Sequence, residues 1–205
     1  MGGGGLTNYG QTPQAIGGVP AAIKGLQMAD GFGCLLTAGD AVQCWGENTF
    51  GELGNGTNTQ SATPVPVTGL GSGVTWLSAN GSTAACAVVA GGDLKCWGQG
   101  VLASDVTTPT DVPGLTSGVV SASVGGEAST CVIMKDGSVQ CWEASSPPTV
   151  VAGISSAVYV ATNEGCSCAL LSNRKIMCWG SCPGSDPSDD AGDDADGGPV
   201  EVQGL

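Results

Sequence analysis

The residues of this sequence best suited to covalent or metal chemistry are its ten cysteines, eight of which recur at one spacing. They form four Cys-x9-Cys pairs, each followed at once by Trp: Cys34/Cys44/Trp45, Cys86/Cys96/Trp97, Cys131/Cys141/Trp142 and Cys168/Cys178/Trp179. Tetrahedral zinc sites favour Cys pairs separated by only two to four residues, whereas this longer spacing suits the two strands of a hairpin. The spacing therefore predicts disulfides rather than zinc binding.

The third unit indicates the register of these hairpins. Lys135, Asp136 and Gly137 lie between two apolar runs and are typical of a three-residue hairpin loop with the glycine in the left-handed conformation. That register places Cys131 opposite Cys141, where cross-strand Cβ atoms are close enough for a disulfide. In the loop-entropy model each such bridge contributes roughly 2–3 kcal/mol, which would compensate for a core with few large side chains.

Two further cysteines, Cys166 and Cys182, stand outside the four pairs and bracket the last hairpin. We expect them to form a fifth bridge at its base. Complete pairing of an even number of cysteines indicates an oxidising compartment, and therefore an extracellular, secreted protein. Met1 is followed by four glycines and not by the basic and then apolar segments of a signal peptide, as expected for a mature or reconstructed form.

A second candidate for chemistry is an acidic segment at residues 185–198, which contains six aspartates. Asp194-x-Asp196-Gly197 matches part of a calcium loop, in which alternating carboxylates bind one hard cation, but Gly192 occupies the position of the first aspartate. One interpretation is a solvated acidic loop, since runs of like charge are usually disordered. The other is a calcium site, and calcium is the only cofactor we consider; its candidate ligands are Asp190, Asp193, Asp194 and Asp196.

The charge and composition exclude several classes of function. With 18 acidic residues, 5 basic residues and no histidine, the net charge is −13, which would repel nucleic acids and anionic lipids. No apolar run approaches the roughly 20 residues that span a bilayer. The absence of histidine excludes His-dependent catalytic triads, and paired cysteines leave no thiol nucleophile. Acidic residues outside the tail, such as Asp93 and Asp136, lie mainly in predicted turns. We therefore predict that the chain is not an enzyme.

The elements that must position the cysteines are short β-strands. A Pro-x-x-(Ile/Val)-x-Gly element recurs five times, beginning at Pro13, Pro64, Pro109, Pro148 and Pro199. Between each of the first four elements and the next cysteine lies a run rich in β-formers, for example residues 74–77 and 158–160. Each unit thus offers about four strands, and the Trp after each second Cys is expected to pack on its sheet.

These units resemble the repeats of the regulator-of-chromosome-condensation propeller family, in the subset that has a Cys-x9-Cys-Trp hairpin. The best match runs from Cys34 to Gly56 and includes Trp45-Gly46-Glu47-Asn48, and the resemblance extends from about Leu6 to Leu205. It implies blade architecture and a bias toward protein–protein contact. The exchange-factor activity of the family's best-known member is not expected here, because no exchange residue maps onto the sequence and fold alone does not give function.

We therefore predict an all-β fold, a single β-propeller domain over residues 1–205. Its four four-stranded units are expected at about residues 13–63, 64–108, 109–147 and 148–198, with 199–205 as a surplus C-terminal strand. A closed four-bladed ring is the favoured arrangement. The alternative is part of a larger ring.

The surplus strand could close its own ring or join a neighbouring molecule's sheet. The predicted function is an extracellular structural protein that self-associates, for example by stacking into a filament. The assembly residues would be Pro199, Val200, Val202 and Leu205. The alternative is a monomeric module that binds another extracellular protein or a glycan, and catalysis ranks third.

Overall fold

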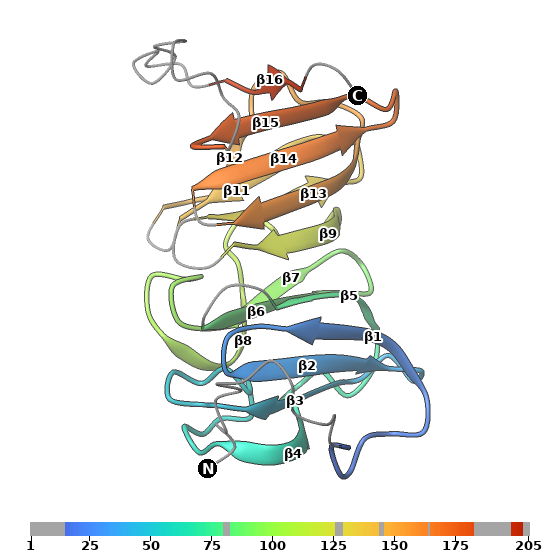
Figure 1. The fold of residues 1–205 in the computed structure, drawn as a ribbon, viewed down its shortest axis with the longest axis vertical. Coiled ribbons are helices and arrows are strands. Elements are labelled where there is room, and N and C mark those ends of the chain that lie inside the picture. Colours follow the sequence, from blue (N-terminus) through green and yellow to red (C-terminus); the bar gives the residue numbers. More distant parts are fainter. Residues whose placement is uncertain are drawn as a thin grey trace, which may run out of the picture.

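The structure is a computed structural model that describes residues 15–79, 83–125, 129–143, 146–163, 165–182 and 198–202. Within those ranges it contains sixteen β-strands and no helix, arranged as four antiparallel sheets of four strands (Figure 1). The strands of the first two sheets are β1 (Ile23–Met28), β2 (Phe32–Thr37), β3 (Val42–Gly46), β4 (Ser61–Pro66), β5 (Val74–Ala79), β6 (Ala84–Val89), β7 (Leu94–Gly98) and β8 (Val106–Asp111). Those of the last two are β9 (Val119–Val124), β10 (Thr130–Met134), β11 (Val139–Trp142), β12 (Thr149–Val150), β13 (Ala157–Asn163), β14 (Cys166–Leu171), β15 (Ile176–Gly180) and β16 (Val200–Glu201). The predicted all-β fold with four four-stranded blades is confirmed.

Each blade is a meander whose strands pair in chain order. The central hairpin has the predicted register, with Cys131 opposite Cys141 and the corresponding cysteines opposite each other in the other blades. At the tip of the β10–β11 hairpin, Gly137 has φ +80 and its N–H donates to the Met134 carbonyl at 2.8 Å. A left-handed glycine at this position is what the three-residue loop predicts.

In the first two blades, the residue after the hairpin tryptophan must be glycine for steric reasons. Gly46 and Gly98 have φ +111 and +93, and a Cβ at either would lie 2.3 or 2.1 Å from a backbone carbonyl oxygen of the preceding strand connection. No larger side chain fits without a shift of the backbone. In the third blade Glu143 takes this place, and β11 ends one residue earlier, at Trp142.

The last strand corrects one part of the sequence analysis. β16 pairs with β15, with Val200 opposite Cys178 and Glu201 opposite Met177, and it is the fourth strand of the last blade rather than a surplus strand. Each Pro element therefore ends a blade instead of beginning one. The copy left without a blade is the first, of which residues 15–19 form no strand. The repeated elements follow one another in the same order whether a Pro element begins a blade or ends one. Only the hydrogen-bond pairing of the strands distinguishes these two ways of dividing the chain into blades.

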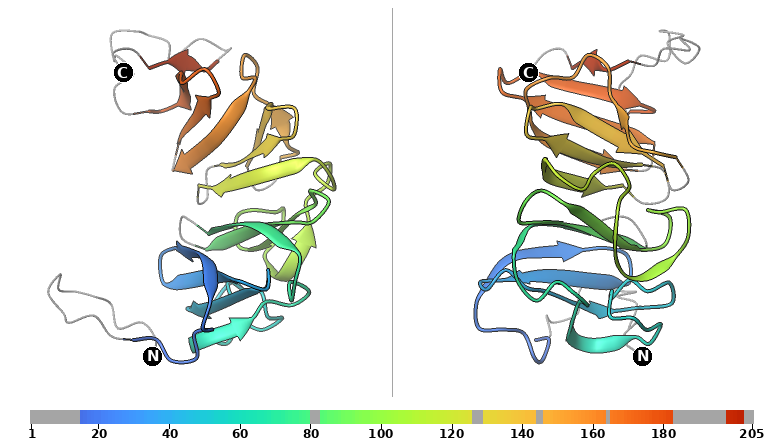
Figure 2. Two further views of the ribbon diagram at one scale, coloured as in Figure 1. Left: turned by 90° about the vertical axis from the view of Figure 1, so that its right-hand side faces the viewer. Right: turned by 180° about the vertical axis from the view of Figure 1, so that it is seen from behind.

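The blades follow one another along an arc, and the first and last blades lie at its opposite ends (Figure 2). The innermost strands β1, β5, β9 and β13 contact one another in sequence along the concave side. The favoured closed ring is therefore not the arrangement seen, and the alternative of an open part of a ring describes it. The rotation between consecutive blades, accumulated over four blades, does not return the chain to its start.

The core is divided among the three interfaces between consecutive blades. Each interface packs the disulfide face of one hairpin against the inner strand and central strands of the next blade. Between the first two blades, for example, Phe32 and Leu53 pack with Leu77 and Trp97. Among the described residues, no helix is long and apolar enough to cross a membrane.

Candidate functional site

All ten cysteines form disulfides, in the pairing that the spacing predicts. The bridges are Cys34–Cys44, Cys86–Cys96, Cys131–Cys141, Cys168–Cys178 and Cys166–Cys182. The sulfurs of Cys166, Cys168 and Cys182 lie within 4.8 Å of one another, but each belongs to a disulfide and is not available as a thiolate ligand. The cysteines are therefore structural.

The candidate calcium ligands Asp190, Asp193, Asp194 and Asp196 lie outside the described residues, and calcium binding stays a prediction. Among the described acidic groups, Asp136 is the one whose pKa clearly differs from its usual value. The Ser138 hydroxyl and, to a smaller extent, the Ser138 amide donate to its carboxylate and lower its pKa. This exposed aspartate stabilises the β10–β11 turn, which is the structural role that turn aspartates usually have.

No other described blade packs on one face of the first blade, here called the first end face, which includes Ile23, Leu26, Met28, Gln43 and Trp45. Leu35 of the same face is buried. The equivalent positions of β5 are Val74, Leu77 and Ala79, which are buried against the preceding blade. In the first blade Ile23, Leu26 and Met28 are exposed instead.

Two polar atoms of the first end face have no hydrogen-bond partner among the described residues. Gln43 Oε1 is buried without a donor. In the second and third blades the tryptophan Nε1–H donates to a carbonyl of the preceding blade, Trp97 to Glu52 at 2.8 Å and Trp142 to Val101 at 3.0 Å. The equivalent N–H groups of Trp45 and of Trp179, which packs in the third interface, make no such bond within the described part of the chain. The first end face therefore has the composition of a blade interface that lacks its other half.

No other described blade packs on the opposite face of the fourth blade, here called the second end face, which is made by the Cys168–Cys178 disulfide, Leu170, Val200 and Val202. The equivalents of Leu170 are buried in the other blades, and Val67, the equivalent of Val202, is buried in the first interface. Val200 and Val202, which the sequence analysis named as assembly anchors, are thus both exposed here. Pro199 precedes the strand, and Leu205 lies outside the described residues.

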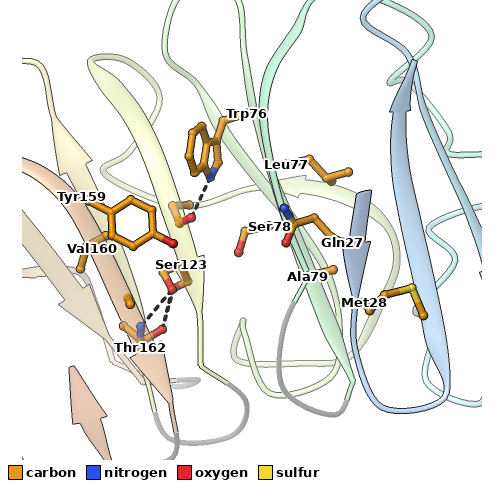
Figure 3. A pocket seen from close by; sticks show the side chains of 12 residues that line it. Gln27, Met28, Trp76, Leu77, Ser78, Ala79, Ser123, Tyr159, Val160 and Thr162 are labelled. Carbon is orange, nitrogen blue, oxygen red and sulfur yellow. Dashed lines mark hydrogen bonds between the residues drawn. The ribbon is translucent and has the colours of Figure 1, made fainter. Parts of the chain in front are cut away.

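A third surface is a concave groove on the inner side of the arc, here called the inner groove, with a volume of about 250 Å³ (Figure 3). It is lined by residues of all four innermost strands, and none of the described lining residues carries a charge. Trp76 and Tyr159 are its aromatic side chains, and Gln27, Ser78, Ser123 and Thr162 are its polar ones.

The two aromatic residues of the inner groove occupy the same position in their blades. Trp76 and Tyr159 each follow the point where the pairing register of the inner strand shifts, after Val74 and Ala157 respectively. Such bulges re-aim side chains and are frequent next to binding sites. The sequence analysis treated both segments only as strands. Trp76 does carry a signal, because it is the one tryptophan of five that does not follow a cysteine.

Four-stranded antiparallel blades arranged around a common concave side define the chain as a protein of the β-propeller class. Residues 41–89 match the model of the regulator of chromosome condensation (RCC1) repeat, so the chain carries this repeat. The predicted resemblance is thereby confirmed. No curated protein sequence matches the chain significantly.

Solved structures with a similar fold include RCC1-like propellers. Human WBSCR16 has a TM-score of 0.68 and 19% identity, with 77% of this chain and 47% of that chain covered. Prp20p from Saccharomyces cerevisiae, in a study that includes its binding to Gsp1p and histones, has a TM-score of 0.62 and 19% identity, covering 77% and 44%. Yeast RCC1 (Prp20) bound to Kap60 has a TM-score of 0.64 and 21% identity, with 77% of this chain and 43% of that chain covered. The chain spans less than half the length of these structures, and the likeness shows the fold alone.

Proposed function

We propose that this chain is a non-catalytic, extracellular structural protein that self-associates head to tail, with the second end face of one copy packed on the first end face of the next. The observation that carries the proposal is that the two end faces correspond to the two halves of an interface that the described blades already make three times. The five disulfides support an extracellular location, since they persist in oxidising compartments. The Prp20p and Kap60 structures support the more general role of protein binding for this fold.

The change in exposure between equivalent positions is large. Leu26 is 53% exposed on the first end face, whereas its equivalent Leu77 is 6% exposed in the first interface. Val202 is 40% exposed on the second end face, whereas Val67 is 3% exposed. Covering such side chains contributes about 1.5–3 kcal/mol each, while association costs about 4–15 kcal/mol in lost freedom. We therefore expect association that depends on protein concentration.

The two end faces differ from each other and lie at opposite ends of the arc (Figure 2). In a dimer formed by a contact between these two faces, one first end face and one second end face remain free. The contact therefore continues into a filament unless the rotation closes a ring. Low charge favours this contact, because residues 1–185 carry only −6 of the total −13. A partner would also supply acceptors and donors for Trp45 and Gln43.

The test uses sedimentation velocity and negative-stain images of the whole chain and of two variants. Leu26→Asp places a charge on the first end face and Val202→Asp places one on the second. Each variant alone should stay monomeric under conditions in which the wild type associates, because burying an unpaired carboxylate is costly. Mixed in equal amounts, the two variants should form a dimer and stop there, since each retains the face that the other lacks.

Val120→Asp is the matched control, because Val120 is an exposed valine of the third blade and belongs to neither end face. This control should associate as the wild type does. A wild type that stays monomeric at high concentration would refute the proposal and favour the monomeric binding module. Association through two identical surfaces would also refute the proposal. In that case, mixing the Leu26→Asp and Val202→Asp variants would give no species beyond those that each variant forms alone.

A further inference from the structure

We propose that the inner groove binds a neutral saccharide, with Trp76 and Tyr159 as its stacking surfaces. This inference goes beyond the proposed self-association, because it concerns the concave side of the arc and not the end faces. A binding pocket usually combines aromatic and apolar surface with polar groups that fix orientation. In the inner groove Trp76 and Tyr159 supply the aromatic surface, and the surface exposed to the groove is otherwise mainly polar, which suits a ligand rich in hydroxyl groups.

Both aromatic side chains present ring surface to the inner groove. Trp76 Nε1–H donates to the Ala122 carbonyl at 2.8 Å, which holds the indole in place and uses its only donor (Figure 3). Tyr159 comes from β13 and reaches over β9 toward the indole, with 54% of its surface exposed. A large exposed aromatic ring in a concavity has apolar area that a ligand can cover. The C–H face of a sugar ring suits such a surface.

Polar groups of the inner groove are available for the hydroxyls of a sugar. The Gln27 amide and the Tyr159 hydroxyl have no hydrogen-bond partner among the described residues. Ser78 Oγ accepts the Val124 N–H at 3.1 Å and Ser123 Oγ accepts the Thr162 N–H at 3.0 Å, so the hydroxyls are held in place by the backbone. Each hydroxyl can still donate its own proton to a ligand oxygen.

The composition also selects against other ligands. Among the described residues that line the inner groove none is a Lys or Arg, so no cation is present to pair with a phosphate, sulfate or uronate, and the net charge of −13 repels anions. Proline-rich peptides dock into aromatic grooves as well. The Trp76 N–H is engaged and cannot donate to their backbone carbonyls, and the decaproline probe below tests whether the other donors of the groove do so.

The volume indicates a small binding unit. At about 250 Å³ the inner groove is slightly below the roughly 300 Å³ at which sites for drug-sized ligands begin. It has room for a short saccharide segment. The four strands that line the groove lie side by side along the concave side of the arc (Figure 2), so a longer chain can extend beyond it.

The experiment is isothermal titration of the whole chain with chitotetraose, cellotetraose and maltotetraose, with tetragalacturonate as the anionic probe and decaproline as the peptide probe. We expect at least one neutral tetrasaccharide to bind and the two other probes not to bind. Tyr159→Ala should weaken that binding about tenfold or more, as the loss of a stacking partner does at other aromatic sites. Tyr159→Phe should retain most of it, because the ring remains.

Val158→Ala is the matched control, since Val158 is the neighbouring, equally exposed residue of β13 and does not line the inner groove. It should bind as the wild type does. The titrations are repeated in the Val202→Asp chain, so that saccharide binding is measured apart from self-association. No heat with any neutral probe, binding unaffected by Tyr159→Ala, or binding of decaproline alone would each overturn the inference.

Discussion

A single buried amide joins the strands of the first blade to the long loop that follows them. Asn48 is 1% exposed, and its Nδ2 donates to the carbonyls of Thr57 at 2.8 Å and Thr59 at 3.0 Å. Its Oδ1 accepts the Leu53 N–H at 2.9 Å. One side chain thus satisfies three backbone groups, and Leu53 is held in the core of the first interface.

We therefore predict that Asn48→Ala lowers the free energy of unfolding by about 2–3 kcal/mol, because buried backbone groups lose their partners. Chemical denaturation measures the change. Asn58→Ala is the control, since Asn58 also donates to a backbone carbonyl, that of Thr49 at 2.9 Å, but on the exposed side of the same loop. It should cost less than about 1 kcal/mol, and an equal loss in both variants would contradict this account.

At the scale of the strands, the hairpin disulfides differ mainly in what covers them. Cys86 and Cys96 are fully buried in the second interface, whereas Cys168 and Cys178 lie half-buried on the second end face. All hairpin bridges close loops of the same length, with a sequence separation of 10. The constraint that each bridge places on the unfolded chain should therefore be equal.

We predict that Cys168→Ala/Cys178→Ala lowers the free energy of unfolding by about 2–3 kcal/mol, the value expected from loop entropy. Cys86→Ala/Cys96→Ala should lose at least about 1–2 kcal/mol more, because removal of buried sulfur also leaves a cavity between two blades. Denaturation of the two double variants under monomeric conditions measures the difference. Equal losses would show that burial does not contribute.

The strands also show what could be predicted from the sequence. The hairpin register followed from local information, because a fixed cysteine spacing around one glycine turn leaves few alternatives. The role of the Pro elements did not, since β16 could be assigned to the last blade only from its pairing with Met177 and Cys178. The inner groove was also missed, because Trp76 and Tyr159 line one groove only through the packing of separate blades.

For the molecule as a whole, each blade has substantial strand contacts only with its sequence neighbours. The free energy of unfolding of such a chain is approximately the sum of the intrinsic stabilities of its blades and of the stabilities of the interfaces between neighbouring blades. The second and third blades have both faces covered, whereas the first and fourth each lack one interface. The first and fourth blades should therefore unfold more readily than the second and third. Self-association should remove this difference in stability by covering both end faces.

Hydrogen exchange measured by mass spectrometry at two protein concentrations tests this account. In the monomer, amides of β1, β2, β14 and β15 should exchange roughly 10- to 100-fold faster than those of β6 and β10, because an opening that needs one interface fewer is easier by about 1–3 kcal/mol. At a concentration where the chain associates, the end blades should become protected while the two central blades change little. The Leu26→Asp chain, in contrast, should keep fast-exchanging ends at both concentrations. Uniform exchange across all four blades would show that the arc opens as one cooperative unit, and protection appearing first in the central blades would show that copies meet elsewhere than at the end faces.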